Sequence, residues 1–198
     1  MAYGEITSGD SYDLRREFIQ DMADVGSEDI ALFAVDKMEE WGFFKMPAST
    51  KYHGTREGDL FLHSKNVAHT LKKITEQVGV KWRNPRSPIL VGYFHDLCKC
   101  DAYQRPALPV KTLGNVPIKD NNSWEHRKDQ LLAGHGEKSV MLASLLCRLT
   151  EEEMLCIRYH MGAYKTEDWD GFDRAIKKYE NVLWTHQADM IASKVLGV

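Results

Sequence analysis

Two adjacent residues, His95 and Asp96, place an imidazole next to a carboxylate at the end of an apolar run, Ile89 to Phe94. Both side chains are ligands for divalent transition-metal ions. Successive residues of a helix point about 100° apart, because one turn takes 3.6 residues. The pair therefore suits one ion at a frayed helix end, or two ions bridged by the carboxylate. An isolated pair of this kind is more often a buried histidine beside a solvated aspartate. Residues elsewhere in the chain are therefore needed to distinguish a metal site from this alternative.

Further imidazoles and one further carboxylate occur in separate segments that have helical patterns. Asp189 lies among Ala188, Met190 and Ile191, and a carboxylate on an apolar face is costly unless it is neutralised. A divalent cation is one way to neutralise it. Helix bundles build metal sites by directing such side chains inward from several helices. The candidate metal ligands are therefore His63, His95, Asp96, His135, His160 and Asp189.

Positive side chains near these donors are candidates for contacts with an anionic substrate. Lys99 follows His95 by one helical turn, so its ammonium group could neutralise a phosphate oxygen. A solvated cation at a helix end is the alternative. The irregular loop of residues 43–58 leads directly into the segment that carries His63, and loops of this kind often contact ligands. The further candidates for substrate binding are Lys51, His53 and Lys138.

The elements that must position these residues are predominantly helical. Two N-terminal helices are expected within residues 1–42, the first over 13–23 and the second running from a Ser27 cap to Trp41. Residues 43–198 form the expected metal-binding core. The two parts together are expected to make a single domain of 198 residues.

The helix expected over residues 60–78 presents one apolar stripe, on which a histidine is more often a core residue than a ligand. Pro88 suits the first turn of the helix that leads to His95 and Asp96. Thr150 and Glu153 match a capping box, which predicts where another helix begins. The stripe of the first of these helices consists of His63, Val67, Leu71, Ile74 and Val78.

Residues 101–132 contain three prolines and read as an irregular excursion, with a short hairpin expected around 110–118. Residues 169–171 read as a turn, and residues 172–196 as one long final helix. In that helix His186 precedes Asp189 by one turn and is either a partner of the ligands or a core residue. The expected class is all-α, and we allow for a short β-hairpin within residues 108–130.

Composition excludes several other functions. The net charge of −3 gives no broad basic surface, so tight nonspecific binding to duplex DNA is not expected. No apolar run reaches the length of a membrane span, and the N-terminus lacks a signal-peptide pattern. The four cysteines show no CxxC spacing and read as reduced thiols of a cytoplasmic protein. Cys98 and Cys100 flank Lys99, which makes a ligand or redox role conceivable, although packing is the more common role.

The order of a histidine at 63, a His-Asp pair at 95–96 and an aspartate at 189 resembles the signature of the HD-domain metal-dependent phosphohydrolases. His135 and His160 look like the two-metal branch, which the HD-GYP cyclic-dinucleotide phosphodiesterases share. From about Phe43 onward the chain is also similar to small bacterial and phage HD hydrolases and to the HD domain of certain bacterial 3′–5′ exoribonucleases. The matching stretches are PASTKYHG, LHSKNV, HDLCK, HGEKS, RYHMG and HQADMIAS. The chain departs from the pattern around residues 109–132 and at Asp59, where relatives often have glycine.

The resemblance implies an HD-domain helical bundle that binds one or two divalent transition-metal ions. His63, His95, Asp96 and Asp189 would hold one ion, and Asp96 would bridge to a second ion held by His135 and His160. Imidazole-rich ligation favours Mn, Fe, Zn, Co or Ni over Mg or Ca. A metal pair activates water and stabilises the oxygens of an in-line phosphoryl displacement.

The expected function is that of a metal-dependent phosphohydrolase acting on a nucleotide or a short oligonucleotide, with Asp96 and Lys99 as the catalytic residues. A mixed-valent di-iron oxygenase is an alternative, because some HD-fold enzymes with similar ligands use O₂. A nucleotide-binding sensor with slow turnover is a third. Four tyrosines could stack on a base, although core tyrosines are more common; they are Tyr52, Tyr93, Tyr103 and Tyr164.

Overall fold

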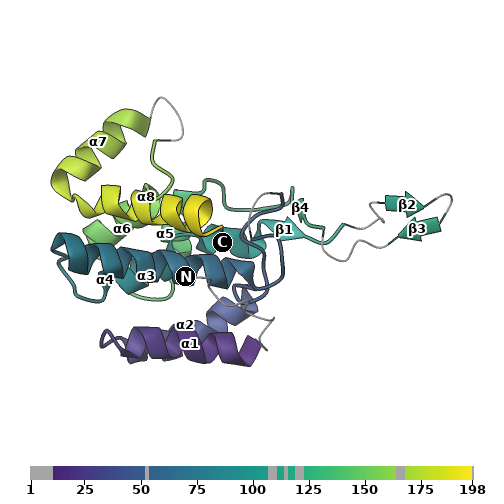
Figure 1. The fold of residues 1–198 in the computed structure, drawn as a ribbon, viewed down its shortest axis with the longest axis horizontal. Coiled ribbons are helices and arrows are strands. Elements are labelled where there is room, and N and C mark those ends of the chain that lie inside the picture. Colours follow the sequence, from purple (N-terminus) through teal and green to yellow (C-terminus); the bar gives the residue numbers. More distant parts are fainter. Residues whose placement is uncertain are drawn as a thin grey trace.

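A computed structural model describes residues 11–51, 54–106, 111–113, 116–118, 123–163 and 168–197. His53, Tyr52 and Tyr164 lie outside the described residues. Helices predominate in the described part, as expected of an all-α protein (Figure 1). The helices are α1 (Ser11–Ala23), α2 (Glu28–Glu40), α3 (Asp59–Val78), α4 (Ser87–Phe94), the 3₁₀ helix η1 (Leu97–Asp101), α5 (Gly136–Ser144), α6 (Glu151–Arg158), α7 (Trp169–Lys178), α8 (Asn181–Ile191) and the π-helical turn η3 (Ala192–Leu196).

An aromatic cluster joins the N-terminal helices to the middle of the bundle. Phe18 of α1 is fully buried and meets the ring of Tyr93 edge-on, with ring centroids 5.0 Å apart. Phe61 of α3 packs on the same tyrosine at 5.9 Å. Buried aromatic pairs of this kind stabilise beyond the area that they bury. Tyr93 is therefore a core residue, and its hydroxyl donates to Asp21 of α1.

A glycine allows α3 and α4 to approach closely. A Cβ atom added at Gly92 would lie 2.2 Å from the Cα atom of Ala68, closer than any packed carbon pair. Only a residue without a side chain fits this crossing, which lies three residues before His95. The close packing fixes the C-terminal end of α4 against α3, the helix that carries His63.

Helix α8 runs alongside α3 in Figure 1, and α5 and α6 lie next to this pair. Helix α8 packs against both α3 and α6, and α6 packs against α5. Gly136, the first residue of α5, faces the carbonyl oxygen of Arg158 so closely that a Cβ atom there would lie 2.1 Å from it. The Gly92 contact joins α4 to α3, and the Gly136 contact joins the start of α5 to the end of α6.

Within the residues that the structure describes, four short strands interrupt the helices. Strands β2 (Lys111–Leu113) and β3 (Val116–Ile118) pair antiparallel, which confirms the expected hairpin over its described residues. This hairpin extends away from the helical body (Figure 1). Strands β1 (Tyr103–Gln104) and β4 (Glu125–His126) form a second antiparallel pair, which periodicity did not predict.

The predicted helix starts at Pro88 and Thr150 are confirmed. Pro88 lies in the first turn of α4. Thr150 Oγ1 accepts a hydrogen bond from the Glu153 amide, and the Glu153 carboxylate accepts one from the Thr150 amide. Ser27 precedes α2 as expected, but its side chain makes no capping hydrogen bond.

The prediction of one long final helix after a turn at 169–171 is wrong. Helix α7 already begins at Trp169. It ends at Lys178, because the backbone of Tyr179 is extended with φ −140° and ψ 100°. Tertiary hydrogen bonds explain the break. The Tyr179 hydroxyl donates to Glu151, and the Asn181 amide donates to the Lys81 carbonyl and to Glu152.

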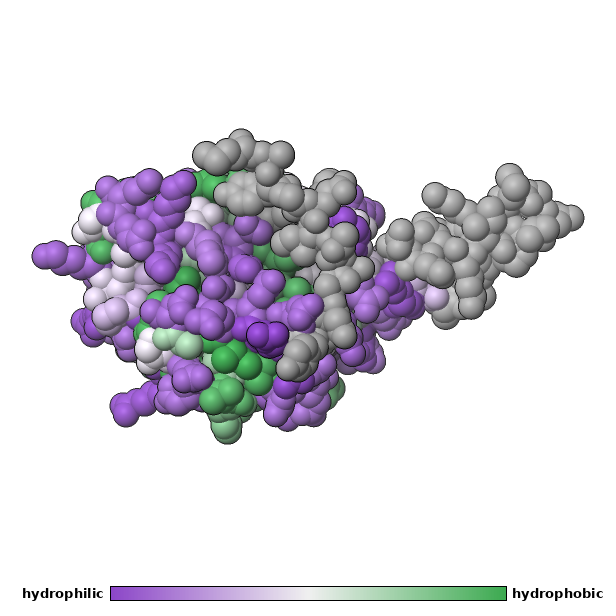
Figure 2. All heavy atoms as spheres, turned by 60° about the horizontal axis from the view of Figure 1, so that its bottom comes forward, coloured by the Kyte–Doolittle hydropathy of each residue, from purple (hydrophilic) through white to green (hydrophobic). Residues whose placement is uncertain are grey.

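Two apolar residues placed inward by the helical patterns instead face solvent. Val78 ends α3 and is 56% exposed, and Met190 of α8 is 41% exposed. On the face shown in Figure 2, hydrophilic residues predominate around a smaller group of hydrophobic ones. Among the residues that the structure describes, no helix combines the length and the apolar character needed to cross a bilayer.

Candidate metal centre

The end of α4 directs His95 and Asp96 toward one point. The helix ends at Phe94, and His95 is still helical with φ −59°. Asp96 leaves the helix with φ −111° and ψ 20°, and η1 starts directly after it. The change of direction removes the 100° separation that a continuous helix would impose on adjacent side chains. Because η1 has about three residues per turn, Lys99 lies on the same side of this helix as Asp96, and its ammonium group reaches the Asp96 carboxylate.

The six predicted ligands come from five segments and meet in the interior. His63 belongs to α3 and Asp189 to α8. His135 immediately precedes α5, and His160 follows the end of α6 by two residues. Five of the six are buried, whereas the side chain of His135 is 39% exposed and marks the solvent-facing end of the cluster.

The carboxylate of Asp96 lies at the centre of the cluster, with each oxygen facing a different group. Oδ2 lies 3.4 Å from His63 Nε2, 3.3 Å from His95 Nε2 and 2.7 Å from Lys99 Nζ. Oδ1 lies 3.0 Å from His135 Nε2 and 3.4 Å from His160 Nε2. The arrangement is that of a carboxylate able to bridge two cations.

The carboxylate of Asp189 completes the group on the Oδ2 side. Its Oδ1 atom lies 3.1 Å from His63 Nε2 and 3.9 Å from His95 Nε2. The two imidazole nitrogens are 3.2 Å apart. In the described part of the chain, three sets of donor atoms are close enough to share an ion: His63, His95 and Asp189; His95, Asp96 and His160; and Asp96, Cys98 and His135.

Backbone carbonyls orient the two most deeply buried imidazoles. His95 Nδ1 lies 2.7 Å from the Gly92 carbonyl oxygen, and His160 Nδ1 lies 2.7 Å from that of Ile157. With Nδ1 donating its proton to a carbonyl, the Nε2 lone pair of each ring points into the cluster. Metal-binding histidines are commonly fixed in this way. His186 donates from Nδ1 to the carbonyl oxygen of His160 at 2.8 Å and so holds the backbone of that ligand.

Two buried atoms at the centre lack a hydrogen bond of acceptable geometry. They are Asp96 Oδ1 and His160 Nε2, which lie 3.4 Å apart. Two facing lone pairs repel each other, and a buried acceptor without a partner is costly. A cation between them would satisfy both. The residues present therefore fit a divalent transition-metal ion, for which imidazole nitrogen and carboxylate oxygen are the usual donors.

The pKa values of the cluster show how it is balanced without an ion. Burial lowers the pKa of His63, but hydrogen bonds with Asp189 and Asp96 outweigh burial and raise it to about 9. Burial also lowers the pKa of His135, but hydrogen bonds with Asp96 and Cys98 outweigh burial and raise it to about 10. Burial raises the pKa of Asp96, but Lys99 and the neighbouring imidazoles hold it well below the usual value.

Asp189 and His160 differ in which effect dominates. Burial raises the pKa of Asp189, but the hydrogen bond with His63 and the electrostatic effect of the neighbouring imidazoles lower it below the usual value. At His160 burial is the stronger effect and lowers the pKa, so this imidazole is neutral at pH 7. In the cluster as a whole, protons on His63 and His135 offset carboxylate charge and would compete with cations.

The other predicted substrate contacts occupy different environments. Lys99 is 16% exposed, and its charge is stabilised by Asp96, which raises the pKa of Lys99 despite burial. Lys138 is buried and bonds to Asp101 and Gln130, which is the environment of a structural cation. Lys51 is exposed on its loop. Substrate binding by these three residues stays a prediction.

Packing is the more common role of a cysteine in the sequence context of Cys98, but its sulfur belongs to one of the donor sets. Cys98 Sγ lies 3.2 Å from His135 Nδ1 and 3.9 Å from His135 Nε2. The Cys98 amide donates to Ser139 Oγ of α5. The available signal was its position two residues after Asp96, which becomes meaningful only once the chain forms η1.

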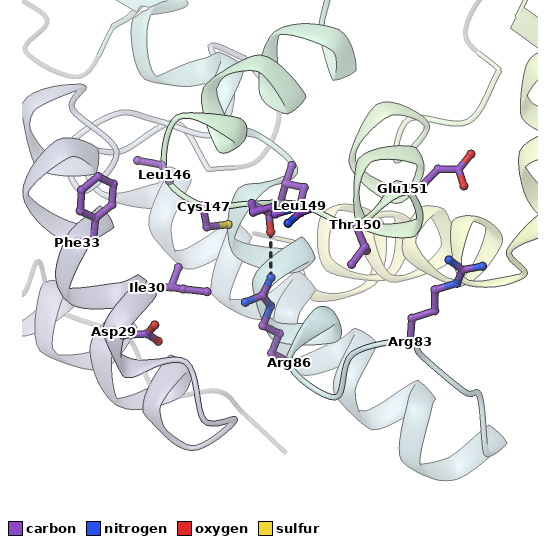
Figure 3. A pocket seen from close by; sticks show the side chains of 11 residues that line it. Asp29, Ile30, Phe33, Arg83, Arg86, Leu146, Cys147, Leu149, Thr150 and Glu151 are labelled. Atoms are coloured by element: carbon purple, nitrogen blue, oxygen red, sulfur yellow. Dashed lines mark hydrogen bonds between the residues drawn. The ribbon is translucent and has the colours of Figure 1, made fainter.

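A cavity of about 810 Å³ lies elsewhere, between α2 and the α5–α6 connection, and contains none of the six predicted ligands (Figure 3). Apolar side chains such as Phe33 and Ile30 form part of its wall, and Arg83 and Arg86 stand at its edge. Arg86 is already bonded to the Arg148 carbonyl. Since the metal-ligand donors converge in the buried cluster, we place the candidate chemistry there.

Comparisons of the chain with protein-family models, with curated proteins and with solved structures found no match. The geometry of the cluster and the order of its residues in the sequence are therefore the basis for assigning a function.

Proposed function

We propose that the protein is a metal-dependent phosphohydrolase that cleaves a phosphoester or phosphoanhydride bond of a nucleotide or short oligonucleotide. The observation that carries the proposal is the position of Asp96, whose two oxygens face two different groups of imidazoles. A carboxylate placed in this way suits a pair of ions at the distance that two-metal phosphohydrolases use, about 3.5–4 Å. The HD-like order of the ligands in the sequence agrees with this interpretation.

The residues divide into two sides of the proposed centre. His63, His95 and Asp189 would hold an ion beside Asp96 Oδ2, and His135 and His160 would hold an ion beside Asp96 Oδ1. When bound, such ions supply an activated water and stabilise the charge that develops on phosphoryl oxygens. The protein's part is to hold the donors rigidly, because the Nδ1 bonds of His95 and His160 fix both rings.

Lys99 would contribute positive charge to substrate binding. Its ammonium group is held by Asp96 and keeps its proton, since its pKa is raised. A fixed cation in a site with little water stabilises a phosphate oxygen more strongly than a solvated lysine does. Lys99 would therefore orient the scissile phosphate.

The burial of the candidate metal ligands limits the size of the expected substrate. Only His135 among the six ligands is substantially exposed, so a substrate would approach from the side of α5. The net charge of −3 does not favour a long polyanion such as duplex DNA. A nucleotide or the end of a short single strand fits both constraints.

The experiment is a substrate screen on protein reconstituted with Mn, Fe, Co, Ni or Zn. Nucleotides, cyclic dinucleotides and short RNAs are incubated with wild-type protein and with Asp96→Asn, and released phosphate or nucleotide is measured. Metal-dependent release that Asp96→Asn abolishes would support the proposal. With iron, O₂ consumption without any such release would indicate the di-iron oxygenase instead. Tight nucleotide binding without product over hours would indicate the sensor.

A further inference from the structure

The thiol of Cys98 is positioned beside the donors on the Oδ1 side of Asp96. Its sulfur lies 3.9 Å from His135 Nε2, the nitrogen that is itself 3.0 Å from Asp96 Oδ1. These three donor atoms are mutually close enough to share one ion. Cys98 is only 4% exposed, and η1 and the bond from its amide to Ser139 fix its backbone.

A second observation at the same place indicates a cation. Asp96 Oδ1 is buried and has no hydrogen bond of acceptable geometry among the described residues, although it points at His135 and His160. The groups that face this oxygen are imidazoles, the nearer being His135 Nε2 at 3.0 Å. A cation bound by the thiol, the imidazole and the carboxylate would satisfy it.

The observed separations suit a tetrahedral ion. Zinc binds sulfur at about 2.3 Å, and imidazole nitrogen or carboxylate oxygen at about 2.0–2.1 Å. A tetrahedral angle then separates sulfur from nitrogen by about 3.6 Å and nitrogen from oxygen by about 3.3 Å. The sulfur-to-Nε2 distance of 3.9 Å and the Nε2-to-Oδ1 distance of 3.0 Å are each within about 0.3 Å of these values, but the sulfur now lies nearer His135 Nδ1, at 3.2 Å, so the thiol or the ring would have to turn on binding.

We propose that Cys98 is a thiolate ligand of the ion on the Oδ1 side, together with Asp96 and His135. On binding, the sulfur–hydrogen bond is replaced by a sulfur–metal bond, and the proton leaves to solvent. This inference rests on the proposed two-ion centre and adds to it a metal preference. Thiolate is a soft ligand, so this side of the centre prefers zinc, cobalt or iron over manganese and magnesium.

Formal charge favours the same assignment. Asp96 and Asp189 contribute two negative charges and Lys99 one positive charge, which leaves −1 when the imidazoles are neutral. Two divalent cations bring four positive charges into a buried site. A thiolate would offset one more of them, whereas a neutral serine or alanine at this position would not.

The test is a cobalt titration of the full-length metal-free protein followed by absorption spectroscopy. Wild-type protein is expected to develop visible cobalt bands together with a near-ultraviolet charge-transfer band from sulfur to cobalt. Cys98→Ser is expected to keep the visible bands, lose the charge-transfer band and bind zinc more than about tenfold more weakly. Its affinity for manganese is expected to change by less than about threefold, because manganese gains little from a soft ligand.

Cys100→Ala is the matched control, because Cys100 lies on the same 3₁₀ helix and is buried in the hydrophobic core. It is expected to keep the charge-transfer band. Should Cys98→Ser fail to fold, X-ray absorption spectroscopy of zinc-loaded wild-type protein tests the proposal instead. A sulfur neighbour of zinc at about 2.3 Å is then expected. Visible cobalt bands without a charge-transfer band in wild-type protein would overturn the role of Cys98 and leave the metal centre standing. No cobalt binding at all would overturn both.

Discussion

Lys99 Nζ lies 2.7 Å from Asp96 Oδ2, and this ion pair compensates only one side of the central carboxylate. The opposite oxygen, Oδ1, faces two imidazoles instead, with His135 Nε2 at 3.0 Å and His160 Nε2 at 3.4 Å. The ion pair forms because the chain turns into a 3₁₀ helix directly after Asp96. Oδ2 therefore lies beside a lysine that keeps its charge, whereas the positive charge beside Oδ1 comes from protonated His135, whose proton a metal ion would replace.

We expect Lys99→Met to lower kcat by at least about 100-fold, because a fixed positive charge would be lost from beside the phosphate. The metal content should remain near the wild-type value, since Lys99 is not a metal ligand. Steady-state kinetics and elemental analysis measure the two quantities. Lys99→Arg retains a charge and should lose less activity. Equal activity in wild-type protein and Lys99→Met would rule out the role of Lys99 in substrate binding.

A weaker effect is expected at His186, which holds the backbone of His160 through its Nδ1 bond. His186→Phe should lower the metal affinity by about tenfold without changing the number of ions bound at saturation. His186→Asn keeps a donor near the position of Nδ1 and should recover part of the loss. His69→Ala, which removes an exposed imidazole paired with Asp21, is the control and should bind metal normally. A wild-type affinity in His186→Phe would contradict the positioning role.

The metal-free protein should lose stability as the pH rises from about 6.5 to 10. The folded-state pKa values of His63 and His135 are raised to about 9 and about 10, above the ordinary value of 6.5. Protonated imidazoles therefore stabilise the folded state fully below pH 6.5, and that contribution is lost as the pH passes the raised values. The carboxylates of Asp96 and Asp189 have lowered pKa values, so their contribution is lost only under acid conditions.

The opposite trend is expected for the extra stability that a bound metal provides. Metal must displace the protons on His63 and His135, so the increase in the free energy of unfolding on adding zinc should grow over the same pH range. Urea denaturation with chelator or with zinc at pH 6, 8 and 9.5 measures both trends. A metal-free protein that becomes more stable between pH 6.5 and 9.5 would be inconsistent with charged imidazoles in the cluster.

The crossing of α3 and α4 should not tolerate a methyl group. Gly92→Ala places a carbon within 2.4 Å of both the Cα and the amide nitrogen of Ala68, so the helices must separate. We expect a loss of about 1–3 kcal/mol in the free energy of unfolding, with a weaker metal affinity because His95 moves. Adding Ala68→Gly should not rescue the variant, since the contacts are to backbone atoms. Lys72→Ala, at an exposed position of α3, should be close to neutral.

Two members of the candidate ligand set stand out in the sequence because each contradicts its local environment. His63 interrupts an apolar helical stripe, and Asp189 stands among apolar neighbours. Such placements are costly without a partner, which makes them visible in a single sequence. Similarly, the start of α6 was predictable because a capping box is a local hydrogen-bond pattern.

The features that were missed depend on contacts between distant segments. The break between α7 and α8 relies on Asn181 reaching Lys81, one hundred residues earlier in the chain. The bond from Lys138 to Asp101 joins residues 37 positions apart. The contact of Cys98 with His135 likewise needs η1 and α5 to be packed together. Periodicity carries no information about such pairs.

The most direct test of the account is the metal content of Asp96→Ala compared with that of wild-type protein. Both are purified without chelator, reconstituted with zinc, and analysed for metal per chain, with circular dichroism as the measure of helix content. We expect one or two ions per wild-type chain, a loss of bound metal in Asp96→Ala, and little change in helix content. If Asp96→Ala keeps the full wild-type stoichiometry, the ligands do not meet at a common cation, and the proposed centre is wrong.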